Sequence, residues 1–157
     1  MLKKLQTIFK AFIISFFFIS TSNAELLEPR SDIKPAEVVG IQLSGLQKND
    51  QNFKDSGIEQ TWNFAHPSNK KATGPLENFK RMIKGASYQM MINHLSHKIT
   101  LLESSKNWAQ FEVIILDKEK IYHKFNWQVE KYLSEGPLKD CWLTTMVSSP
   151  IPLGSSI

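Results

Sequence analysis

One histidine could do chemistry because of where strand alternation places it. The stretch Ile121–Glu130 (IYHKFNWQVE) alternates apolar and polar side chains with the period of a β-strand, so successive residues face opposite sides of a sheet. His123 is the one ionisable group on the apolar face, which also carries Ile121, Phe125, Trp127 and Val129. Turned toward a core, His123 either hydrogen-bonds a neighbour or contacts a ligand beside the Trp127 ring.

The other histidines are weaker candidates for chemistry. His94 and His97 are three residues apart, a spacing that brings side chains together on a helix, but they precede an expected strand. No third ligand follows at a recognisable spacing, so we expect no metal site. His66 precedes Pro67 at an expected helix end, where its ring can bond the last carbonyls. The chain has no nucleophile elbow, phosphate loop or dinucleotide fingerprint, and we expect no cofactor.

Helical spacing of apolar residues indicates three helices in the first half of the chain. The Gly40 and Gly45 positions weaken the first helix and suggest close packing against a neighbour. Pro67 should end the second helix, and Thr73 should cap the third after a polar loop. The expected helices cover Pro35–Lys48, Ser56–His66 and Thr73–Gly85, and the loop covers Pro67–Ala72.

The second half of the chain changes to the two-residue period of strands. Four strands are expected, joined by a tight hairpin loop at residues 117–120 and by a connection containing Gly136-Pro137. Three helices followed by a strand meander predict an α+β domain, with the helices on one face of an antiparallel sheet. The expected strands cover Lys98–Glu103, Trp108–Leu116, Ile121–Glu130 and Cys141–Val147.

Residues 1–24 have the pattern of a signal peptide. Three lysines precede the apolar run Ala11–Ser20, and Ser22-Asn23-Ala24 places small residues just before Glu25. An uncleaved anchor is the alternative, although the run is short for the roughly 20 residues that span a bilayer. We expect export, to the periplasm first, with the thylakoid lumen or the medium as alternatives, and no membrane contact after cleavage.

Removal of this leader leaves about 133 residues, which suit one domain over 25–147 and a flexible, Pro/Gly/Ser-rich tail over 148–157. Without the three leader lysines, 16 Lys and Arg face 15 Asp and Glu. A nearly neutral chain gives no electrostatic footprint for nucleic acid. Cys141 is the only cysteine, so no internal disulfide forms, and its apolar surroundings suggest a buried, inert thiol.

Three motifs resemble an uncharacterised domain family of photosynthetic organisms and bacteria. They are W-x-F-A-x-P-x-N-x-x-x-T-G-P-L-x-x-F from Trp62, Y-x-x-M-x-N-H over Tyr88–His94, and the pair Cys141-Trp142. That family is similar to the cone-shaped fold of nuclear transport factor 2 and the SnoaL-like proteins. The resemblance implies a curved four-stranded antiparallel sheet (a cystatin-like cone) with three helices enclosing a cavity, and it implies no activity.

Cone-fold isomerases and dehydratases use a carboxylate or a His–Asp pair inside the cavity. Here Glu112 and Glu130 fall on polar strand faces, Asp117 and Glu119 lie in a turn, and Glu103 ends a strand. No strand carboxylate clearly faces inward, which argues against catalysis, and an acid from a loop or helix, such as Glu59, is the alternative. An isomerase- or dehydratase-like enzyme using His123 remains the alternative, and it requires a carboxylate within hydrogen-bond reach of that ring.

We therefore predict a non-catalytic protein that binds a small apolar molecule or docks a protein partner. A deep cavity with convergent polar groups would favour the ligand. A flat apolar patch on the outer face of the sheet would favour a partner or a homodimer through the sheet. The residues expected at the ligand pocket are Trp62, His66, Tyr88, His123 and Trp127.

Overall fold

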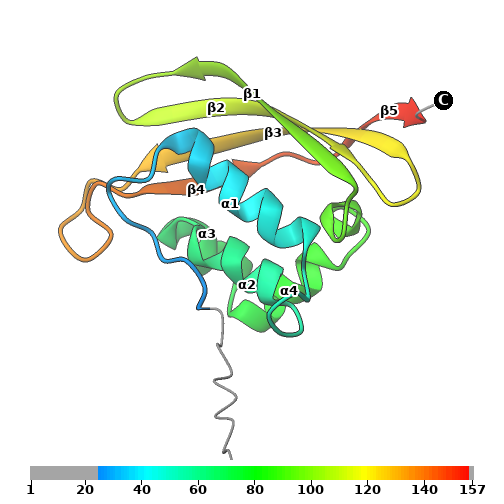
Figure 1. The fold of residues 1–157 in the computed structure, drawn as a ribbon. Coiled ribbons are helices and arrows are strands. Elements are labelled where there is room, and N and C mark those ends of the chain that lie inside the picture. Colours follow the sequence, from blue (N-terminus) through cyan, green and yellow to red (C-terminus); the bar gives the residue numbers. More distant parts are fainter. Residues whose placement is uncertain (1–24, 156–157) are drawn as a thin grey trace, which may run out of the picture.

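A computed structural model describes residues 25–155 as helices packed on one face of a five-stranded antiparallel sheet (Figure 1). The first helix, α1, lies against the strands, and α2 packs on α1 (Figure 1). The α3 helix contacts β4 directly, and α4 contacts α2 and α3. Within residues 25–155, the opposite face of the sheet carries no helix (Figure 1). The helical elements are α1 (Pro35–Gln47), α2 (Ser56–Asn63), α3 (Pro67–Thr73), α4 (Leu76–Ile83) and the 3-10 turn η1 (Gln89–Met91).

The sheet has the order β1-β2-β3-β4, and β5 pairs with the first residues of β3. All neighbouring strands are antiparallel. Because β4 pairs with the second half of β3, β4 and β5 lie one after the other along the same side of β3. The strands are β1 (Ser96–Ser104), β2 (Trp108–Leu116), β3 (Ile121–Lys131), β4 (Trp142–Val147) and β5 (Ile151–Ser155).

The α+β class is confirmed, whereas the part of the chain that the structure describes forms five strands rather than four. The additional strand, β5, falls inside the segment expected to be a loose tail. Pro152, which stands opposite His123, cannot donate to a ladder, so the sequence argued against a strand there. The proline is tolerated because β5 lies at the edge of the sheet, where one side of the strand needs no partner.

The expected polar loop at Pro67–Ala72 is wrong, because these residues form most of α3. Pro67 occupies the first position of that helix, where its fixed φ and missing N–H do no harm. Thr73 is therefore the last residue of α3 and not the cap of the next helix, whose N-cap is Pro75. Gly74, with a φ of 77°, separates α3 from α4, and the described chain has four α-helices instead of three.

The core lies between α1 and the inner face of the sheet. Every second residue of β2 and β3 is buried there, as the alternation predicts, including Phe111, Phe125 and Trp127. The α1 helix covers this face with residues spaced along one side: Val38, Val39, Leu43 and Leu46. Burial of this apolar surface is the main source of stability.

The α2 helix packs closely on α1 because glycines stand at their crossing. A Cβ built on Gly57 would come within 2.0 Å of the carbonyl oxygen of Gly45. The Asn49 side chain, just after α1, also bonds to α2, since its Oδ1 accepts from the amide of Ile58 at 3.1 Å. Close packing was expected at Gly45 and is confirmed, whereas at Gly40 the nearest atom would be 3.9 Å away.

Ion pairs join α2 to α4. Lys84 lies 2.6 Å from the largely buried carboxylate of Asp55, and Lys80 lies 2.8 Å from Glu59. Cys141 is buried, as expected, and burial raises the pKa of its thiol. The expected signal peptide, residues 1–24, lies outside the described residues. Between residues 25 and 155, no helix has the length and hydropathy needed to cross a bilayer.

Candidate functional site

An interior pocket of about 150 Å³ lies between the helices and the second half of β3. Side chains from α1, α2, α3, α4, η1, β3 and β4 meet around it, so the whole fold shapes the cavity. Among the described residues, none that lines it is charged. The apolar walls are Leu46, Ala65, Phe79, Met82, Ile83, Met91, Trp127 and Val147, and the polar lining is Gln42, Thr61, Asn69, Thr73, Tyr88 and Thr144.

A buried chain of hydrogen bonds runs along the inner wall of this pocket. The indole N–H of Trp127 donates to Thr144 Oγ1 at 3.1 Å, and that hydroxyl donates to Gln42 Oε1 at 2.6 Å. Gln42 Nε2 then donates to the carbonyl oxygen of Thr61 at 3.0 Å. The chain connects β3, β4, α1 and α2, and it satisfies polar groups whose burial would otherwise be costly.

The outer part of the pocket is polar and partly exposed. The hydroxyl of Tyr88 donates to the carbonyl of Val147 at 3.3 Å, and Asn69 Nδ2 donates to the carbonyl of Thr144 at 3.1 Å. Each of these donors leaves acceptor atoms on the same side chain. Met82 is 36% exposed, so a flexible apolar side chain stands where α4 meets solvent.

Two of the five predicted pocket residues line this cavity, Tyr88 and Trp127. Trp62 does not line the pocket but packs against Phe79, which does: the two ring centroids are 5.1 Å apart. Lys70 Nζ lies 5.5 Å from the centroid of the Trp62 ring. His66 lies outside the pocket and caps a helix, but it caps the start of α3. Its Nδ1 accepts from the amide of Ser68 at 3.1 Å, which differs from the expected bond to the preceding helix.

His123 faces inward, as the alternation predicts, and has a carboxylate partner that the sequence argument missed. Its Nε2 lies 2.7 Å from Oδ2 of Asp117, which is only 2% exposed. The inference that no carboxylate faces inward is therefore wrong. Strand alternation could have predicted the inward position of Asp117, because Asp117 follows Ile115 by two residues and continues the buried face of β2 into the turn.

Asp117 also stabilises the turn between β2 and β3. Its Oδ1 accepts from the amides of Glu119 and Ile121, both at 2.9 Å, and so shapes the hairpin between β2 and β3. Burial tends to raise the pKa of this carboxyl, but the bonds from Ile121 and His123 outweigh burial and hold the pKa below its ordinary value. With Asp117 ionised, His123 donates through Nε2, while its Nδ1 is buried without a partner.

The His94 and His97 rings bond each other. His94 Nε2 lies 2.7 Å from His97 Nδ1, and His94 Nδ1 lies 2.7 Å from the carbonyl oxygen of Met91. Burial lowers the pKa of both rings. Neutral rings satisfy this chain if each Nδ1–H donates, to Met91 and to His94 respectively. In residues 25–155, no group of three or more His, Cys, Asp and Glu side chains is placed to hold a metal.

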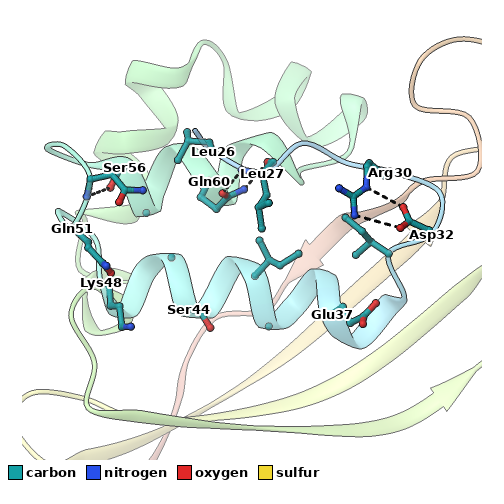
Figure 2. Close-up of a pocket in the computed structure, with 16 residues that line it drawn as sticks. Leu26, Leu27, Arg30, Asp32, Glu37, Ser44, Lys48, Gln51, Ser56 and Gln60 are labelled. Carbon is teal, nitrogen blue, oxygen red and sulfur yellow. Dashed lines mark hydrogen bonds and ion pairs between the residues drawn. The ribbon is translucent and has the colours of Figure 1, made fainter. Parts of the chain in front are cut away.

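A second hollow, an open groove of about 730 Å³, lies between the arm at residues 26–33 and the helices α1 and α2 (Figure 2). Gln60 holds the arm, because its Oε1 accepts from the amide of Leu27 and its Nε2 donates to the carbonyl of the same residue, both at 2.8 Å. Arg30 pairs with Asp32 along the rim, at 3.0 Å (Figure 2). Charged, polar and apolar side chains line the groove, and their polar atoms do not converge on one point where a ligand could bind.

Comparison of the chain with protein families, with curated proteins and with solved structures finds no match. The interior pocket, with its apolar walls and convergent polar groups, is therefore the candidate site on its own geometry.

Proposed function

We propose that this protein binds a small, uncharged molecule in the interior pocket. The observation that carries the proposal is the combination of a largely apolar pocket with the buried chain Trp127–Thr144–Gln42 along its inner wall. The lining is mostly apolar and reaches solvent at its outer end, at Met82. An apolar occupant would therefore be stabilised in it, because binding removes apolar surface of both partners from water.

The lining restricts the chemistry of the occupant. A cavity of about 150 Å³ can hold a molecule of roughly the size of benzene. Trp127, Phe79 and the aliphatic walls favour an apolar or aromatic body. Free acceptor atoms on Tyr88 and Asn69 favour one hydroxyl or amine at its outer end. The absence of a lining cation disfavours a carboxylate, which would be desolvated without a partner.

Calorimetric titration with three probes tests this function. Phenol should bind the wild-type protein, benzene should bind more weakly, and benzoate should give no signal. Val147→Phe places a larger side chain at the pocket and should abolish phenol binding. Leu133→Phe, a change at a side chain 59% exposed and outside the pocket, should leave phenol binding unchanged. Absence of phenol binding to the wild type, or equal binding of benzoate, would refute the proposal.

A second candidate function is general-base chemistry at His123, because Asp117 supplies the carboxylate that such chemistry requires. Neither residue lines the interior pocket or the arm groove, and His123 Nδ1 is buried. A general base must be reached by its substrate. Diethyl pyrocarbonate should therefore modify His123 in the folded protein if this function is correct. Modification only after unfolding would eliminate it.

We also propose the architecture and the compartment that the sequence suggested. Helices on one face of an antiparallel sheet, with a pocket between them, support the cone-shaped fold of the nuclear transport factor 2 and SnoaL-like proteins. The basic and apolar start of the chain supports export to the periplasm. Cleavage before Glu25 would be seen as the mass of the secreted chain, and retention of the full leader would contradict it.

A further inference from the structure

The outer edge of β1 is an unusual surface for a protein that remains a single chain. β1 is nine residues long, stands at the end of the strand order, and none of its residues is fully buried. Leu101 is 54% exposed and Leu102 is 52% exposed. An edge strand presents unpaired backbone N–H and C=O groups, and proteins usually blunt such edges with proline, with charged residues such as lysine or with β-bulges. The β1 strand contains no proline, but it carries Lys98 and a bulge at Leu102, so only a register that fits both can form.

The outer face of the sheet is less suited to association than this edge. Its side chains along β2 and β3 are mostly polar, including Gln110, Asn126 and Gln128. Glu112 of β2 and Lys124 of β3 are diagonal neighbours whose charged atoms lie 3.7 Å apart, and they give the face a mixed charge. A homodimer packed through this face would bury these groups, whereas edge pairing would leave them in solvent.

We propose that two copies of this chain associate by antiparallel pairing of their β1 strands about Thr100, which forms one continuous ten-stranded sheet. This inference is independent of the ligand pocket. In antiparallel strands, opposite residues lie on the same face of the sheet. Pairing about Thr100 places Ile99, which packs against the core, opposite the exposed Leu101 of the second copy on the inner face of the sheet.

Charge complementarity selects this register. The β1–β2 register shifts between Leu101 and Glu103, so Leu102 is an extra residue and Glu103 faces outward. With this bulge in both copies, outward-facing Lys98 of each copy stands beside Glu103 of the other. Neither residue forms an ion pair within residues 25–155. The two-fold axis produces this contact twice, and opposite charges across strands stabilise pairing.

Charge reversal at these two positions gives a sharp test by sedimentation equilibrium. Lys98→Glu places like charges together twice in a homodimer, and so does Glu103→Lys. Each variant should raise the dimer dissociation constant at least tenfold. Mixing the two variants should restore association, because the two reversed side chains then meet at one contact and the unchanged Lys98 and Glu103 meet at the other. The double variant should also dimerise like the wild type.

A third variant tests the apolar part of the edge. Leu101→Asp should weaken the dimer at least tenfold, while Leu133→Asp, an equally exposed leucine outside the sheet, should not. Thermal unfolding confirms that each variant is folded. A wild-type protein that is monomeric at millimolar concentration would overturn the proposal. So would a mixture of the two charge variants that stays monomeric, because complementary charges would then have no partner across the edge.

Discussion

The hydroxyl of Thr144 lies 2.6 Å from the side-chain oxygen of Gln42, and this contact joins residues that are 102 positions apart in the chain. Thr144 also accepts from the indole of Trp127 at 3.1 Å, so one hydroxyl holds β3, β4 and α1 together along the pocket wall. This one buried hydroxyl therefore supports the pocket wall and provides the hydrogen-bond partner of both Trp127 Nε1 and Gln42 Oε1.

Thr144→Val should lower the free energy of unfolding by about 3 kcal/mol, because it leaves Trp127 Nε1 and Gln42 Oε1 buried without partners. Chemical denaturation measures this loss. The neighbouring Thr145 is half-buried and makes longer bonds, at 3.3 and 3.5 Å, to Glu130 and Gln128. Thr145→Val should therefore cost less than about 1 kcal/mol. If both variants lost the same free energy of unfolding, the hydrogen bonds of Thr144 would contribute no more to stability than those of Thr145.

The sequence predicted the strands better than the site, for physical reasons. Alternation with period two is a local signal, and it placed His123 and Trp127 correctly on the inner face of β3. Helical spacing places Gln42 on the buried face of the first helix, but it does not show that Gln42 meets Thr144, because only the tertiary fold brings these two residues together. The α3 helix was missed because its polar composition resembles a loop and because Pro67 both follows α2 and begins α3.

Gly57→Ala should destabilise the protein by about 3 kcal/mol or more, because the new methyl group would overlap the Gly45 carbonyl at 2.0 Å. Gly40→Ala is the matched change on α1, where the nearest atom is 3.9 Å from the new Cβ. It should raise stability by about 0.5–1 kcal/mol, since alanine is the better helix former. Denaturant midpoints measure both effects. Tolerance of Gly57→Ala would contradict the close α1–α2 crossing.

The stability of the folded protein should fall as the pH decreases below about 6.5. Burial lowers the pKa of His94, so the unfolded chain takes up a proton there more readily than the folded chain does. This difference contributes at most about 1.4 kcal/mol per pH unit, until the folded pKa is passed. His94→Gln should flatten the slope of stability between pH 8 and pH 5. His66→Gln, at the start of α3, serves as the control and should keep the slope.

Asp117 should contribute stability that is present above about pH 4 and lost as the pH falls through its lowered folded pKa. Asp117→Asn removes this acid-dependent part. It also places an amide N–H against His123 Nε2 and forces the ring to carry its proton on the buried, unpartnered Nδ1. We expect a loss of about 2 kcal/mol at pH 7. Glu119→Gln, at an exposed position of the same turn, should change neither the stability at pH 7 nor its decrease in acid.

The central claim, that a small neutral molecule occupies the interior pocket, can be tested directly by methionine methyl NMR. Met82 and Met91 line the pocket, whereas Met146 is 39% exposed and lies outside it. Titration with phenol should shift the ε-methyl signals of Met82 and Met91 and leave that of Met146 in place, and benzoate should move none of them. Phenol that shifts no pocket methyl, or that shifts Met146 to the same extent, would contradict the proposed function.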